Sequence, residues 1–172
     1  MLVKTIALPK EEAENLIKTL VFIGVVVIIP SLIHIQWITG PIVNAILFLA
    51  VILVGGRNAL LIGLIPSIIA LYFGLLPAPL APLIPFIMIS NAILVVLFDW
   101  LKKNYWTAII VAATVKFLFL HVSTSTIMDL ILRKELAPKV AQILSWPQFY
   151  TALIGGFIAW IFIKFYKVKI SK

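Results

Sequence analysis

The sequence predicts an all-α integral membrane protein in which a single domain, residues 1–172, forms a bundle of six transmembrane helices. Hydrophobic residues make up 63% of the chain and charged residues only 12%, and the mean hydropathy is +1.20. A soluble domain is about half apolar and about a quarter charged. Because a globular core of this size cannot hide so much apolar surface from water, lipid must be the solvent for most of the chain.

Six apolar stretches account for the predicted helices, since a transmembrane helix needs about 20 mainly apolar residues. Pro41 suits the first turn of the second helix, and Gly55-Gly56 suits its end. Residues 76–85 are rich in proline, which predicts an extended path packed over the outer end of the bundle. The predicted helices cover residues 15–35, 41–54, 58–74, 85–101, 106–122 and 147–168.

The net charge of +8 predicts an orientation in the membrane rather than a nucleic-acid partner. Cytoplasmic segments of membrane proteins are rich in Lys and Arg. Ten of the fourteen basic residues fall at the two termini or in the turns after the second and fourth helices, and three fall between the fifth and sixth. This bias predicts a multi-pass protein of the plasma membrane with both termini in the cytoplasm. The ten are Lys4, Lys10, Lys18, Arg57, Lys102, Lys103, Lys164, Lys167, Lys169 and Lys172, and the three are Arg133, Lys134 and Lys139.

With this orientation, three segments face the outside: residues 34–40, the proline-rich segment and residues 123–145. They are richer in proline, aromatic, histidine, amide and hydroxyl residues than the inner turns, which are short and basic. This asymmetry predicts a binding site that faces outward.

Lys116 is the strongest candidate site residue, because ionisable groups within a membrane are expensive and usually functional. It lies well inside the fifth helix, where snorkelling to water is difficult. Ala112 and Ser123 lie on the same face of the predicted helix as Lys116. This suggests close helix packing on the inner side of the amine and a polar neighbour on its outer side. Two interpretations stay open. Lys116 binds an anionic or carbonyl group of a ligand, or it pairs structurally with Asp99, a carbonyl or a lipid phosphate.

Several amide and aromatic residues are further candidates. Asn91 and Asn44 each lie within a predicted helix, where a buried amide needs a partner, either a ligand or a neighbouring helix. Trp37 and Thr39 lie at the mouth of the second helix. Trp37 is either a stacking wall for a ligand or an anchor in the membrane interface.

The outer end of the fifth helix carries a polar cluster that includes His121, Ser123 and Ser125. Its hydroxyls either meet a ligand or bond back to helix carbonyls. Gln148 opens the sixth helix. The predicted substrate-binding residues are therefore Lys116, Asn91, Asn44, Trp37, Thr39, His121, Ser123, Ser125 and Gln148.

The sequence also excludes several kinds of chemistry. It contains no cysteine and only two histidines, without a clear carboxylate partner, so neither a thiol nucleophile nor a metal site is expected. The sequence has no His-Glu-x-x-His or Gly-x-Ser-x-Gly motif, no phosphate-binding Gly-rich loop and no ATPase motif. We therefore expect a protein that is not an enzyme and has no cofactor. A membrane enzyme acting on a lipid, or a structural or assembly subunit of a larger membrane complex, are the alternatives.

Three passages carry a resemblance to a known family: Trp-Ile-Thr-Gly-Pro-Ile-Val-Asn-Ala (37–45), Leu-Ile-Gly-Leu-Ile-Pro-Ser (61–67) and Pro-Leu-Ile-Pro-Phe-Ile-Met-Ile-Ser-Asn (82–91). With six short helices, the chain resembles the substrate-binding S components of energy-coupling factor (ECF) vitamin transporters. The resemblance implies an outward-facing pocket, a membrane scaffold subunit and two cytoplasmic ATPases as partners, and uptake of a vitamin or similar small organic micronutrient. The chain departs from the family because its first helix lacks an Ala-x-x-x-Ala stripe for docking to the scaffold.

Overall fold

A computed structural model describes residues 9–74, 78–130 and 144–168. These residues are helical throughout, with short turns between the helices and no strand among them. Five of the α-helices are long and apolar enough to cross a membrane, and α3 is a shorter apolar helix. The elements are α1 (Lys10–Leu32), α2 (Gln36–Val54), α3 (Gly56–Tyr72), the 3-10 helix η1 (Ala78–Leu83), α4 (Ile84–Leu101), α5 (Tyr105–Leu130) and α7 (Trp146–Phe165).

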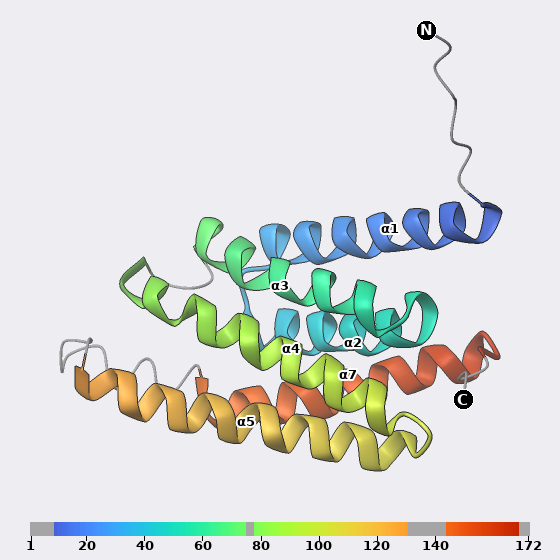
Figure 1. Cartoon of the computed structure of the whole chain (residues 1–172). Coiled ribbons are helices and arrows are strands. Elements are labelled where there is room, and N and C mark those ends of the chain that lie inside the picture. The colour runs from blue at the N-terminus through green and yellow to red at the C-terminus, as the bar shows by residue number, and fades with distance from the viewer. Residues whose placement is uncertain (1–8, 75–77, 131–143, 169–172) are drawn as a thin grey trace, which may run out of the picture.

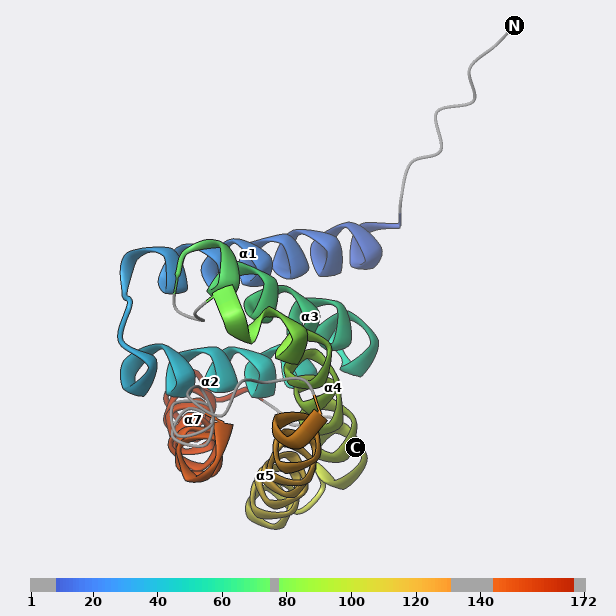
Figure 2. The ribbon, with the colours of Figure 1, turned by 90° about the vertical axis from the view of Figure 1, so that its left-hand side faces the viewer.

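The helices form a bundle built around α2, which packs against α1, α3, α4 and α7. Figures 1 and 2 show α1 on one side of α2 and α7 on the opposite side. Because α2 is apolar on all its faces, it is stable only where other helices surround it, and its residues from Asn44 to Val51 are all buried. The N-terminal end of α1 and the C-terminal end of α7 lie at the same end of the bundle (Figure 1).

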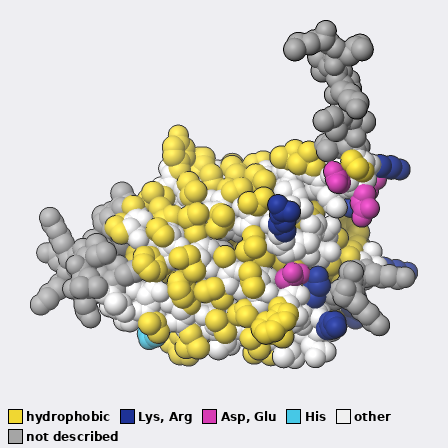
Figure 3. Space-filling model, viewed as in Figure 1, with side chains coloured by type: hydrophobic (Ala, Val, Ile, Leu, Met, Phe, Trp, Pro, Cys, Tyr) yellow, Lys and Arg dark blue, Asp and Glu magenta, His cyan; other side chains and the backbone are white. Residues whose placement is uncertain are grey.

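The surface of the bundle is apolar, as lipid contact requires. Large hydrophobic side chains are exposed along the described helices, among them Ile17, Leu32 and Ile110. Figure 3 shows yellow hydrophobic side chains across the face of the molecule, while the dark blue Lys and Arg side chains lie toward the end that carries the termini. The described residues therefore form a helical membrane bundle with one basic end.

The second predicted helix begins too late. α2 starts at Gln36 rather than at Pro41, so Pro41 lies within the helix. A proline there removes one helical hydrogen bond, that to the Trp37 carbonyl, and the helix continues because most of its length is packed inside the bundle. We predicted α2 to be short, but it has 19 residues and α3, with 17, is shorter.

The fifth predicted helix ends too early, because α5 continues past residue 122 to Leu130. Its hydroxyl residues are compatible with a helix since they bond back to carbonyls. The Ser125 and Thr126 hydroxyls both donate to the Val122 carbonyl, at 2.9 and 3.0 Å. The polar cluster that includes Ser123 and Ser125 therefore lies within α5 rather than beyond its end.

The proline-rich segment is not extended over its described part. Ala78–Leu83 form η1, which leads directly into α4, where Pro85 occupies the first turn. Proline fits both places because its fixed φ of about −65° is also a helical value. Residues 76 and 77 lie outside the described residues. The other bounds agree better: α3, α4 and α7 match their predictions within about three residues at each end, while α1 starts at Lys10 rather than at residue 15.

Candidate functional site

A partly enclosed cavity of about 110 Å³ lies between the helices. All six α-helices or their flanks contribute to it: α1, α2, α3 and α4 near the ends where α1 leads into α2 and α3 into α4, α5 near its middle, and α7 in its first turn. The cavity is thus in the half of the bundle opposite the two described ends of the chain (Figure 1). One residue from each helix in turn is Pro30, Asn44, Ser67, Asn91, Lys116 and Gln148.

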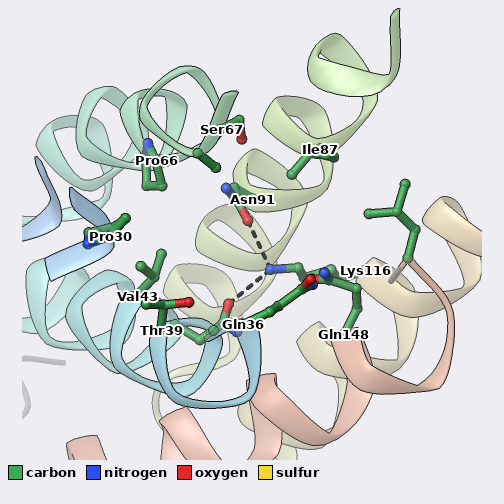
Figure 4. A pocket seen from close by; sticks show the side chains of 14 residues that line it. Pro30, Gln36, Thr39, Val43, Pro66, Ser67, Ile87, Asn91, Lys116 and Gln148 are labelled. Atoms are coloured by element: carbon green, nitrogen blue, oxygen red, sulfur yellow. Dashed lines mark hydrogen bonds between the residues drawn. The ribbon is translucent and has the colours of Figure 1, made fainter. Parts of the chain in front are cut away.

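Lys116 is the centre of this site. Its side chain is only 2% exposed, and its Nζ donates hydrogen bonds to Asn44 Oδ1 and Asn91 Oδ1, each at 2.8 Å. Figure 4 shows both bonds converging on the amine from two neighbouring helices. Among the described residues that line the cavity there is no Asp or Glu. Two neutral oxygens therefore hold the amine, without a counter-charge from this part of the chain.

The two asparagines are themselves held by other helices, which fixes the direction of their oxygens. Asn91 Nδ2 donates to the Gly63 carbonyl of α3 at 3.1 Å. Asn44 Nδ2 donates to Thr151 Oγ1 of α7 at 3.4 Å, and the Thr151 hydroxyl donates to the Gln148 carbonyl at 3.2 Å. Because each amide nitrogen is engaged by a neighbour, each amide oxygen faces Lys116 (Figure 4).

Asn44 can occupy this place because α7 comes very close to α2. A Cβ built on Gly155 would lie 2.7 Å from the Pro41 carbonyl oxygen and 2.7 Å from Asn44 Cβ. Such distances are too short for any other side chain. Gly155 therefore allows the helix contact that places Asn44 beside Lys116.

The structure contradicts the pairing of Lys116 with Asp99. The Asp99 carboxylate accepts a bond from Lys102 Nζ at 2.8 Å, one turn away at the end of α4. Of the other two structural partners, a carbonyl agrees with the observed contacts, because the acceptors are the amide carbonyl oxygens of Asn44 and Asn91. Pairing with a lipid phosphate stays a prediction.

Five of the predicted site residues line the cavity: Lys116, Asn91, Asn44, Thr39 and Gln148. Thr39 is 4% exposed, and its hydroxyl donates to the Ile35 carbonyl at 3.1 Å. These five residues come from four helices, and the fold brings them together around a single space.

The other four predicted residues do not line the cavity. Trp37 is 60% exposed on the surface of α2, which fits an interfacial anchor rather than a stacking wall. His121 is exposed and stacks on Phe117, with ring centroids 5.7 Å apart. Ser123 is half-buried, and the Ser125 hydroxyl donates to the Val122 carbonyl of the same helix. The cavity around Lys116 thus leaves out Trp37, His121, Ser123 and Ser125, and a role for them in binding stays a prediction.

Two polar residues line the cavity but are missing from the predicted set, Gln36 and Ser67. Gln36 could have been predicted, because it lies in the same segment as the candidates Trp37 and Thr39. Ser67 follows Pro66 in an apolar helix and is 3% exposed. In the sequence it falls on a stripe with Ala59 and Gly63, which indicates close packing equally well.

No protein-family model matches the chain, and neither a curated protein nor a solved structure is similar to it. The resemblance to ECF S components therefore stays a prediction from the sequence.

Proposed function

We propose that this chain is a membrane-embedded substrate-binding subunit for uptake of a small organic solute, such as a vitamin or similar micronutrient. The observation that carries the proposal is the Lys116 amine, held by Asn44 and Asn91 at the wall of a cavity between the helices. The solute would present an anionic or carbonyl oxygen to that amine.

The chemistry of the amine supports a ligand of this kind. An ammonium has three N–H donors, and two of them are used by the amide oxygens. Among the described residues these two oxygens are the acceptors, which leaves the third donor for a solute. Because burying an unpaired charge is costly, an anionic group that neutralises the ammonium gains more than it would in water. A charge-assisted hydrogen bond of this type contributes about 1.5–3 kcal/mol.

The proposal extends to orientation and partners. The basic residues near the termini favour cytoplasmic ends, which would place the cavity in the outward half of the bundle within the plasma membrane. Since the sequence contains no ATPase motif, uphill uptake would need an outside source of energy. An ECF scaffold subunit with two cytoplasmic ATPases is the proposed source. Because the first helix lacks the usual docking stripe, the chain would bind a scaffold differently or act alone.

The orientation can be tested with single cysteines, because the natural chain has none. His34 is exposed in the turn between α1 and α2, and Lys164 is exposed near the end of α7. In intact cells, a membrane-impermeant maleimide should label His34→Cys and should label Lys164→Cys only after the membrane is opened. The reverse pattern would mean that the termini face outward.

The functional proposal predicts two results for the purified chain. Isolation from its native membrane in mild detergent should recover ATPase subunits, and reconstitution with them should give ATP-dependent accumulation of a small solute in vesicles. A stable complex that binds no solute would favour a structural subunit instead. Chemical conversion of the solute would favour a membrane enzyme.

Removing one of the two amides should weaken binding without abolishing it. We expect Asn91→Ala to lower the affinity for small acids about tenfold, because Asn91 is one of the two amides that hold the Lys116 amine in position. Trp37→Ala is the control, since this exposed side chain does not line the cavity. Isothermal titration of both variants measures the difference. Equal affinities of the two variants would contradict the site assignment.

A further inference from the structure

The Ser67 hydroxyl is a buried polar group that the contact between Lys116 and a solute does not involve. Its side chain is 3% exposed, it lines the cavity, and its Oγ has no hydrogen-bond partner among the described residues. Buried polar atoms without a partner are rare in folded proteins, and each calls for a physical explanation, such as a role in binding.

One carbonyl that this hydroxyl could bond to within its own helix is already in use. A serine within a helix often donates to the carbonyl four residues earlier, which for Ser67 is the Gly63 carbonyl. That carbonyl already accepts the Asn91 side chain at 3.1 Å. Ser90, another fully buried serine, does bond back, to the Ile87 carbonyl at 2.7 Å. Among the described residues, Ser67 is thus left with a free donor and acceptor at the cavity wall.

We infer that Ser67 is a second polar anchor for the solute, at some distance from Lys116. This inference rests on the proposed function. In Figure 4, Asn91 lies between Ser67 and Lys116, so the two anchors lie on different parts of the wall. A solute that uses both must carry two polar groups: an anionic or carbonyl oxygen for Lys116 and a hydroxyl, amine or carbonyl for Ser67.

The size and lining of the cavity narrow the solute further. A volume of about 110 Å³ is somewhat less than the roughly 150 Å³ of an engineered cavity that binds benzene. Aliphatic residues make up part of the wall, among them Val43, Pro66 and Ile87. The structure therefore assigns to this site a compact acid or carbonyl compound with one further polar group.

The test compares acids that differ only in the second polar group. Benzoate and butyrate carry the carboxylate alone. The monohydroxy derivatives of each acid add a hydroxyl at three different distances from the carboxylate. Isothermal titration measures the affinity of each acid for the wild-type protein, Ser67→Ala, Ser90→Ala and Lys116→Met. Ser90→Ala is the matched control, because Ser90 is equally buried but has its own partner and does not line the cavity.

We expect at least one hydroxylated acid to bind the wild-type protein about tenfold more tightly than its parent, as one added hydrogen bond predicts. Ser67→Ala should remove this preference, while Ser90→Ala should keep both the preference and the parent acid's affinity. Thermal unfolding of solute-free Ser67→Ala should show no loss of stability, because no hydrogen bond among the described residues is removed.

Two other outcomes would overturn the inference, and they differ in what they leave standing. If the parent acids bind through Lys116 but the wild-type protein shows no preference for any hydroxylated acid, or if Ser67→Ala keeps that preference, Ser67 is not an anchor and the proposed function stands. If no acid binds any better to the wild-type protein than to Lys116→Met, both the anchor and the proposed function are wrong.

Discussion

Replacing Lys116 by methionine should lower the affinity for small acids between about tenfold and about a hundredfold, while the protein still folds. The loss follows from removing a charge-assisted hydrogen bond to the solute. Methionine keeps an unbranched chain of similar length in a position that is 2% exposed, so the space is filled. The fold should survive because an apolar replacement also removes the cost of a buried amine.

The control for this substitution is Lys102→Met. Lys102 also makes a 2.8 Å contact, but with Asp99 near the basic end of the bundle and away from the cavity. This variant loses one positive charge, as Lys116→Met does, and should keep the full affinity. Isothermal titration and thermal unfolding of both variants separate a site effect from a general effect of charge. Equal losses of affinity in the two variants would refute a specific role for Lys116.

The second large effect is expected from Gly155→Ala, which should destabilise the bundle and weaken binding together. The new Cβ would lie within 2.8 Å of three atoms of α2, two of them in its backbone: the Pro41 carbonyl oxygen and the Ala45 nitrogen. Backbone atoms cannot rotate away, so α2 and α7 must separate. Overpacking of this kind costs about 1–3 kcal/mol, and it displaces Asn44 from Lys116.

Gly24→Ala provides the matched control because a Cβ at residue 24 of α1 meets nothing within 4 Å. Alanine is favoured over glycine within a helix by about 1 kcal/mol, so this variant should be as stable as the wild type or more so. Thermal unfolding in detergent compares the two variants directly. A Gly155→Ala protein as stable as Gly24→Ala would show that the α2–α7 contact is looser than described.

The sequence predicted the six-helix architecture because hydrophobicity and helix length are local properties of each segment. Its errors lie where tertiary packing decides. Pro41 is typical of a helix start, yet α2 begins before it because neighbouring helices surround that segment. We predicted residues 123–130 to lie outside the fifth helix because they are polar. They extend α5 instead, because a hydroxyl side chain can donate a hydrogen bond to a carbonyl of its own helix.

The candidate site was predictable only in part for the same reason. The cost of polar groups in lipid singled out Lys116, Asn91 and Asn44 separately, but no spacing in the sequence shows that they meet. Their meeting depends on how α2, α4 and α5 pack. Ser123 was placed with Lys116 by helical phase, whereas the residue buried on that part of α5 is Thr124, at 5% exposure. Ser67 went unassigned since a serine beside small residues predicts packing as well as binding.

The most direct test of the Lys116 cavity is to identify the small molecules that purified protein retains. Wild-type protein and Lys116→Met are purified in parallel in mild detergent, denatured, and their released compounds are compared by mass spectrometry. We predict that a compact acid or carbonyl compound is enriched in the wild-type sample and absent from the variant. Recovery of the same compounds in equal amounts from both samples would contradict a solute site at Lys116.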